Sequence, residues 1–191
     1  SIGSVASGFG GAVLQSGGAL TVNDMVITGS TCVFTSSVAV GNGTLNLLRT
    51  SISGNTCNNV SGIYLQDSNA VLLDSTLSNN TGSSGDAIRT DASNGNNTLT
   101  LNNVTISGNT TSTDNSAVRL QPQAGRSISF TATNSTISGN STSGPGKGAI
   151  WVNGVGTHTI VLHSTIVSGN TVNGVANDFE GTVDAAQSEF N

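Results

Sequence analysis

The side chains that could perform acid–base or metal chemistry are few in this sequence, and they are dispersed. Its 191 residues include ten Asp and Glu, five Lys and Arg, and two His. The nearest approach to a charged cluster is Asp67, Arg89 and Asp91, while His158 and His163 have no obvious carboxylate or serine partner. Glycoside cleavage and calcium-assisted chemistry both need clustered carboxylates. We therefore expect a protein that is not an enzyme and carries no metal or cofactor, with polysaccharide cleavage as an alternative.

The two cysteines offer a different chemistry. Cys32 and Cys57 are 25 residues apart (57 − 32 = 25), and the same spacing recurs through much of the chain. If this spacing is one structural repeat, the two side chains occupy the same place on adjacent coils, within the Cα separation that a disulfide requires. We expect a disulfide between them, and hence an oxidising, extracellular setting.

A row of aromatic, basic and amide residues recurs with similar spacing and could bind sugars. Tyr64 could stack on Arg89, and Trp151 could stack on Arg119, as cation–π pairs. Polar residues two positions further along could add hydrogen bonds to a sugar chain. The complete set is Tyr64, Gln66, Arg89, Asp91, Arg119, Gln121 and Trp151. The interpretation that we favour is that these long side chains shield the face of a sheet.

Two rows of hydroxyl side chains follow the same period. The residues are Thr28, Ser51, Ser53, Thr76, Ser78, Thr105, Ser107, Thr136, Ser138 and Ser168. On a sheet, the rows would be about 6.7 Å apart along each strand, with about 4.8 Å between strands. They resemble the Thr-x-Thr faces of β-solenoid antifreeze proteins, which implies ice binding. Because Val26 and Ile166 interrupt one row and the other is mostly serine, ice binding is an alternative function here.

The elements that must position these side chains can be inferred from a short phrase, Ser-Gly-Asn (S-G-N) or a variant of it, that recurs along the chain. An apolar residue precedes each copy of this phrase. Its successive positions are Ile2, Ile27, Ile52, Leu77, Ile106, Ile137 and Val167. They are separated by 25, 25, 25, 29, 31 and 30 residues. A period in the twenties, with insertions in later copies, is typical of a solenoid whose extra residues form loops.

Within one copy, the hydrophobic pattern is that of strands. In the stretch TLTLNNVTISGN, apolar residues alternate with threonine and serine, which is the two-residue period of a half-buried strand. Stacked copies align apolar residues into columns that begin Val13, Val38, Ile63, then Leu20, Leu45, Ala70, and Val22, Leu47, Leu72. We therefore predict one all-β domain over residues 1–191, a right-handed parallel β-helix of six to seven coils, each with 25–31 residues and three short strands.

An asparagine ends the phrase, at a corner, in five of the seven copies. The five positions are Asn55, Asn80, Asn109, Asn140 and Asn170. Stacked amides can hydrogen-bond along the axis of such a fold, so we expect a structural ladder. The residue before each, such as Gly54, should adopt a backbone conformation that a Cβ disfavours, and Asn79 replaces glycine there once.

The repeats carry a family resemblance. GGAV at 10–13, GDAI at 85–88 and KGAI at 147–150, each followed by a copy of the I-S-G-N phrase, are similar to repeats of bacterial secreted right-handed parallel β-helix proteins. They resemble more distantly the GGAI repeats of the polymorphic outer-membrane proteins of chlamydiae. Such proteins include adhesins, surface-layer or filament components and polysaccharide-active proteins. The resemblance implies an extracellular or cell-surface location, but it does not imply one activity.

Composition limits the partners that we expect. Five basic residues form no patch for nucleic acid, and no apolar run approaches the about 20 residues needed to span a bilayer. The opening SIGSVASG aligns with the middle of a coil, and neither end shows a capping helix. Because uncapped coil edges can pair with further strands, we expect a structural protein that associates with itself end to end, as a filament, surface layer or adhesive stalk. Surface glycans are the alternative partner.

Overall fold

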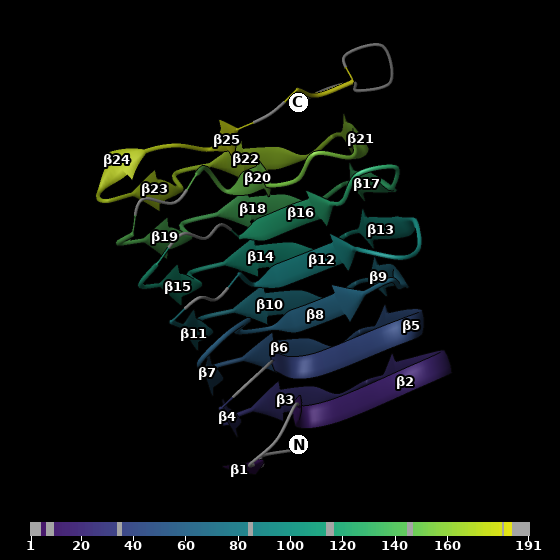
Figure 1. Ribbon diagram of the computed structural model, residues 1–191. Helices are drawn as coiled ribbons and strands as arrows, with labels where there is room; N and C mark the ends of the chain where they lie inside the picture. Colours follow the sequence, from purple (N-terminus) through teal and green to yellow (C-terminus); the bar gives the residue numbers. More distant parts are fainter. Residues whose placement is uncertain are drawn as a thin grey trace.

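The chain folds as a stack of mostly parallel strands wound into a β-solenoid (Figure 1). The computed structural model describes residues 5–6, 10–33, 36–83, 86–113, 117–144, 147–180 and 182–184. All regular secondary structure among these residues is β-strand. No helix long and apolar enough to cross a membrane occurs among the described residues. The all-β parallel solenoid predicted from the repeat is confirmed.

A six-stranded sheet contains the apolar residues that mark the repeat. Its strands are β3 (Val26–Thr28), β6 (Ser51–Ser53), β10 (Thr76–Ser78), β14 (Thr105–Ser107), β18 (Thr136–Ser138) and β22 (Ile166–Ser168). Ile27 pairs with Ile52, and Ile52 pairs with Leu77, so the predicted register is confirmed. Six rungs enclose five complete turns (6 − 1 = 5), slightly fewer than the six to seven coils expected. The first expected marker, Ile2, lies outside the described residues.

An eleven-stranded sheet has two arms that are joined by long strands. β2 (Gly10–Asn23) and β5 (Ser36–Leu48) run through both arms, and β5 pairs with the next strand of each. The first arm continues through β8 (Ile63–Gln66), β12 (Ile88–Ala92), β16 (Val118–Pro122), β20 (Ile150–Val152) and β25 (Phe179–Glu180). The second arm continues through β9 (Asn69–Leu73), β13 (Asn97–Asn102), β17 (Ser127–Thr133) and β21 (Thr157–His163).

Later coils carry extra residues at the bend between these two arms. Residues 67–68 connect β8 to β9, whereas residues 93–96, 123–126 and 153–156 form the corresponding connections in the following coils. Strand pairing stays in register on both sides of the longer connections. Most of the lengthening of the repeat from 25 to 29–31 residues is therefore accommodated at this bend.

An eight-stranded sheet adds a short strand to each coil that the sequence pattern did not reveal. Its members are β1 (Val5–Ala6), β4 (Thr31–Cys32), β7 (Thr56–Cys57), β11 (Thr81–Gly82), β15 (Thr110–Thr111), β19 (Ser141–Thr142), β23 (Thr171–Val172) and β24 (Val175–Ala176). β24 runs antiparallel to β23, and the other pairs are parallel. Two residues are too few to show an alternating pattern, so this strand was not predicted. Each coil therefore has a fourth short strand in addition to the three that were expected.

Inward-pointing side chains fill the solenoid with stacked apolar columns. Leu47, Leu72 and Leu101 pair in register from one coil to the next, and all three are fully buried. The other two predicted columns are confirmed by the same strand pairing. Burying one such side chain stabilises the fold by about 1.5–3 kcal/mol, so the columns are a main source of stability.

Two corners of each coil have left-handed backbone geometry. At the corner before the ladder asparagine, φ is +63° at Gly54 and +54° at Asn79, as predicted. The corner before each strand of the six-stranded sheet has non-glycine residues with positive φ, such as Arg49 at +45° and Asp74 at +48°. The Arg49 N–H donates to a carbonyl oxygen of the next coil, 3.0 Å away. Hydrogen bonds between coils thus hold a conformation that side chains normally disfavour.

Candidate functional site

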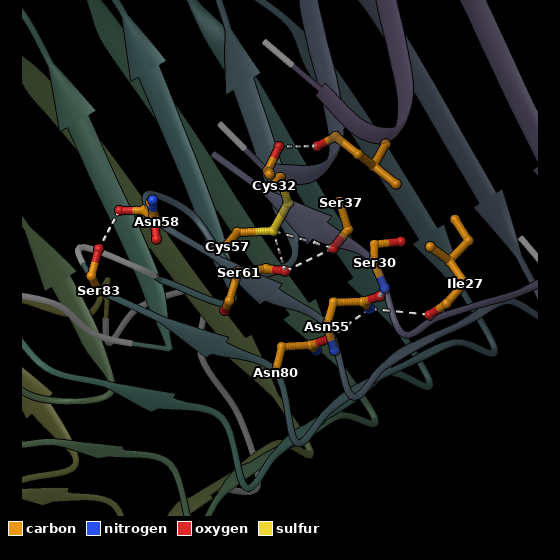
Figure 2. Close-up of a disulfide and its surroundings, with 12 residues drawn as sticks. Ile27, Ser30, Cys32, Ser37, Asn55, Cys57, Asn58, Ser61, Asn80 and Ser83 are labelled. Carbon is orange, nitrogen blue, oxygen red and sulfur yellow. Dashed lines mark hydrogen bonds between the residues drawn. A yellow bond between two sulfur atoms is a disulfide. The ribbon is translucent and has the colours of Figure 1, made fainter. Parts of the chain in front are cut away.

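The disulfide predicted from the cysteine spacing is present and joins neighbouring strands β4 and β7 (Figure 2). The Cα atoms of Cys32 and Cys57 are 4.4 Å apart, and each residue is 1% exposed. Beside them, the Ser37 hydroxyl donates to the carbonyl oxygen of Ser61, 2.9 Å away. The bond therefore links two coils from inside the solenoid. A disulfide is typical of proteins in oxidising compartments.

The five predicted asparagines form one continuous ladder along the axis. The Nδ2 group of each donates to Oδ1 of the next: Asn55 to Asn80 (2.8 Å), Asn80 to Asn109 (2.9 Å), Asn109 to Asn140 (2.9 Å) and Asn140 to Asn170 (2.8 Å). Each Nδ2 also donates to a backbone carbonyl, as Asn55 does to Ile27 at 3.1 Å. The five residues are at most 5% exposed. The ladder therefore satisfies its buried amides and ties successive coils together.

Different residues occupy the two ends of the ladder. At one end, the Ser30 N–H donates to Asn55 Oδ1 at 2.9 Å (Figure 2), while the Ser30 hydroxyl is buried with no partner in the described part of the chain. At the other end, Asp178 Oδ1 accepts from Nδ2 and from the backbone N–H of Asn170, both at 2.9 Å. Asp178 was not predicted because it lies outside the repeat, eight residues after the last asparagine of the ladder (178 − 170 = 8).

A second buried ladder consists of hydroxyl groups that sequence analysis did not single out. Its members are Thr50, Ser75, Ser135 and Thr165. The Thr50 N–H donates to Ser75 Oγ at 3.1 Å, and the Ser75 hydroxyl donates to a carbonyl two residues earlier at 2.7 Å. Val104 occupies the equivalent place once, and its N–H donates to Ser135 Oγ at 3.2 Å. The signal for this ladder in the sequence is a serine or threonine directly before the strand that each coil contributes to the six-stranded sheet.

The predicted aromatic and basic strip lies on the outer face of the first arm, where strand pairing aligns its members. The Asp91 carboxylate accepts from the Tyr64 hydroxyl at 2.9 Å and from Nε and Nη2 of Arg89 at 2.9 and 2.8 Å. The Arg89 guanidinium lies 5.5 Å from the centre of the Tyr64 ring. Burial raises the pKa of Tyr64, and the Asp91 carboxylate raises it further. The Tyr64 hydroxyl therefore stays protonated and donates to Asp91.

The remaining residues of the strip also contact one another. Arg89 Nη2 donates to Gln121 Oε1 at 3.2 Å, and the Arg119 guanidinium lies 4.8 Å from the centre of the Trp151 ring. Gln66 is exposed on the same face. Because the central polar groups bind one another, the arrangement favours shielding of the sheet. Glycan binding at the strip stays a prediction.

Asp67 and Asp91 do not form a paired site. Asp67 Oδ1 accepts the backbone N–H groups of residues 93–95 at 2.7, 2.7 and 3.0 Å. Partial burial by itself raises the pKa of Asp67, but these hydrogen bonds outweigh it and hold the pKa below its usual value. Asp67 therefore fixes the loop at the bend, while His158 and His163 lie apart on β21. The described residues contain no group of three or more His, Cys, Asp or Glu that could hold a metal ion.

The ten predicted hydroxyl residues point outward from the six-stranded sheet in two rows. Strand pairing places Thr76 beside Thr105 in one row and Ser78 beside Ser107 in the other. None of the ten hydroxyls forms a hydrogen bond within the described ranges of the chain, so all ten are available to water. Val26 and Ile166, 45% and 58% exposed, end the first row with apolar side chains.

A third outward row, on the eight-stranded sheet, was not predicted. Its members are Thr31, Thr56, Thr81, Thr110, Ser141 and Thr171. Five of these six are threonine, so this row is richer in threonine than either row on the six-stranded sheet. The signal in the sequence was the hydroxyl residue directly after each residue of the asparagine ladder.

Comparisons with models of known protein families, with curated proteins and with solved structures found no match for this chain. The described residues form a solenoid with two internal ladders, a disulfide between two coils and outward rows of hydroxyl groups. Such a solenoid can present a repeating polar surface along its sides, and among the described residues β22 is an edge strand of the six-stranded sheet.

Proposed function

We propose that this protein is an extracellular, non-enzymatic structural protein, a β-solenoid subunit of a filament, surface layer or adhesive stalk. The observation that supports this function best is the asparagine ladder, which ties the coils from Asn55 to Asn170 through buried amide bonds. The disulfide between Cys32 and Cys57 adds a covalent link between two coils. Bending the solenoid strains ladder and strand hydrogen bonds together, which suits a load-bearing element.

Association through the ends of the solenoid is the mode of assembly that we propose. A terminal rung exposes backbone N–H and C=O groups that can pair with another strand. Among the described residues, β22 is an edge strand of the six-stranded sheet, and its outward Ile166 is 58% exposed. Head-to-tail addition produces an open filament when the rotation between copies does not close a ring.

Electron microscopy and light scattering after size-exclusion chromatography test this function on purified native material. We expect fibres or arrays, and a mass that grows with protein concentration. Ile166→Lys should suppress assembly because a charge on an edge strand opposes pairing. The matched control is Val155→Lys in a loop, where Val155 is 81% exposed. Monodisperse monomers at every concentration would contradict stacking.

Ice binding is the second candidate, and the rows of unpartnered hydroxyls favour it. On the six-stranded sheet they form a lattice of about 4.8 by about 6.7 Å. A surface that holds water at regular spacing can order it without competition from bonds inside the protein. The third row, on the eight-stranded sheet, extends the same polar character to a second face.

Thermal hysteresis and ice-crystal shaping test the second candidate. We expect Thr105→Tyr to abolish any hysteresis, because the ring interrupts the row in which Thr105 stands between Thr76 and Thr136. The matched control is Thr159→Tyr, at an exposed position on the eleven-stranded sheet. Equal activity of both variants and the unaltered protein would remove the six-stranded sheet as the ice-binding face.

A further inference from the structure

The chain folds back on itself after the last parallel rung. Asn173 and Gly174 have φ of +51° and +75°, as a tight hairpin turn requires. β24 then runs antiparallel to β23, and β25 pairs in parallel with β20. Residues 175–180, which we call the strap, therefore cross the end of the solenoid and cover parts of two sheets.

The strap reproduces hydrogen bonds that each internal coil makes with the next. Inside the solenoid, Asn140 donates from N and Nδ2 to Asn170 Oδ1 at 3.0 and 2.8 Å, and its carbonyl accepts the Thr171 N–H at 2.9 Å. At the end, Asn170 donates from the same two groups to Asp178 Oδ1, and its carbonyl accepts the Asn177 N–H, all at 2.9 Å. Asp178 and Asn177 thus replace the asparagine and threonine of a further coil, in reverse order along the chain.

Asp178 ends the ladder instead of continuing it. A carboxylate accepts hydrogen bonds but, unlike a carboxamide, has no N–H group to donate to another rung. Phe179 packs against the apolar core, and Glu180 forms an ion pair with Lys147 at 2.9 Å. The strap therefore closes both the ladder and part of the core at this end.

The strap covers less than a complete coil would cover. It pairs with β23 and β20, whereas β22 gains no partner strand from it in the part of the chain that the structure describes. Beyond the strap, the Asp184 N–H donates to the Ile160 carbonyl of β21 at 2.8 Å. A coil with the period of this chain would pair with all four strands of the last turn and would partly cover Ile166, as the equivalent Thr136 is partly covered on the preceding rung.

We propose that the surface beneath the strap is a docking surface for a coil of a second copy of this chain, and that the strap is the intramolecular stand-in for that coil. The proposal rests on the self-association proposed above and adds its regulation. The occupant follows from the hydrogen bonds: Asn170 requires an oxygen acceptor, while β20 to β23 require strands of matching period. The junctions between Asn55 and Asn170 meet these requirements together, with an asparagine Oδ1 as the acceptor at each.

Attachment of the strap to the chain determines when the surface is open. A tethered segment competes at a high effective concentration, so dilute copies stay closed. An incoming coil offers more strand pairing than the strap and covers part of Ile166, so it displaces the strap once the protein is concentrated. Assembly is therefore gated by concentration.

Sedimentation velocity over a concentration series, with full-length variants, tests the proposal. We expect Asp178→Ala to raise the apparent association constant about tenfold or more, because it removes both hydrogen bonds from Asn170 and a single hydrogen bond to a charged group already corresponds to about tenfold. Lys147→Ala, which removes the ion pair to Glu180, should act in the same direction by less. The matched control is Thr98→Ala, which removes an exposed hydrogen bond to Asn69 in the middle of the solenoid and should assemble like the unaltered protein.

The outcomes separate the strap from the stacking function. A synthetic peptide of residues 173–184, added to Asp178→Ala protein, should restore the monomer. Equal assembly of all variants, with no effect of the peptide, overturns the strap proposal and leaves stacking intact. No assembly of any variant overturns stacking, and the docking surface with it. Thermal melting establishes that the variants are folded, and Lys147→Ala carries the test if Asp178→Ala is unfolded, because it alters no ladder residue.

Discussion

At the scale of the single residue, a ladder asparagine serves three coils at once. Oδ1 of Asn109 accepts from N and Nδ2 of Asn80 at 3.0 and 2.9 Å. Its Nδ2 group donates to Asn140 Oδ1 at 2.9 Å and to the Leu77 carbonyl at 3.0 Å. A shorter or purely accepting side chain cannot do both, which explains why one residue type recurs at this corner.

Asn109→Ala should therefore destabilise the protein strongly. Each buried polar group left unpaired costs about 1–3 kcal/mol, and this change affects groups on both neighbouring coils. We expect the free energy of unfolding, measured in urea, to fall by at least about 3 kcal/mol. The control is the half-buried Asn153, whose replacement by alanine should change it by less than about 0.5 kcal/mol. Equal effects of the two substitutions would contradict the ladder's role.

Asp67 should make the loop at the bend sensitive to acid. Its pKa is lowered in the folded protein, so its contribution to stability is present above the usual Asp pKa of about 3.9 and is lost as the pH falls through the folded value. We expect hydrogen exchange of the amides of residues 93–95, corrected for the intrinsic rate, to accelerate below about pH 4. Asp67→Asn should exchange faster at neutral pH and lose this pH dependence, whereas Asp24→Asn should behave like the unaltered protein.

At the scale of the element, sequence reasoning was sufficient for features that repeat. The apolar columns, the positive φ of Gly54 and Asn79, and the pairing of Cys32 with Cys57 all follow from one period of 25 residues. A repeat fixes such positions because each coil must cover the core of its neighbour. The register of the strands was therefore predictable without knowledge of any single contact.

Features that occur once, or that are very short, were not predictable in this way. Asp178 terminates the ladder from a segment outside the repeat, so no column pointed to it. The hydroxyls of Thr50 and Ser75 belong to a repeat, but their sequence pattern does not distinguish a buried hydroxyl from an exposed one. The strip around Asp91 was located correctly, yet its internal hydrogen bonds depend on side-chain conformations that spacing does not determine.

The junction between β4 and β7 should depend on its disulfide more than other junctions depend on any one bond. Ser30 contributes only its backbone N–H to the ladder there, and its hydroxyl is buried without a partner among the described residues. Replacing Cys32 and Cys57 with serine should lower the free energy of unfolding by about 3 kcal/mol. It should also increase the rate of hydrogen exchange more in β4 than in β15. Adding Ser30→Asn should recover part of that loss. A uniform change in exchange along the chain would contradict a local staple.

At the scale of the whole molecule, each coil contacts only its neighbours, so stability is close to a sum over coils and junctions. Central coils have a partner on both sides, whereas β22 is an edge strand of the six-stranded sheet in the described part of the chain. We expect native-state hydrogen exchange to be slowest at the buried Leu72 and Leu101 and fastest in β22. Equal protection along the chain would contradict this gradient and indicate a single cooperative unit.

The bend between the two arms of the eleven-stranded sheet absorbs added residues without disturbing the pairing on either side. Its connections at residues 93–96, 123–126 and 153–156 succeed one another, each displaced by about the 4.8 Å spacing of neighbouring strands. Peptides grafted into these connections would be displayed in an evenly spaced line along one edge of the solenoid. Such a scaffold could present several copies of an epitope to a multivalent receptor, with the backbone setting the interval between them.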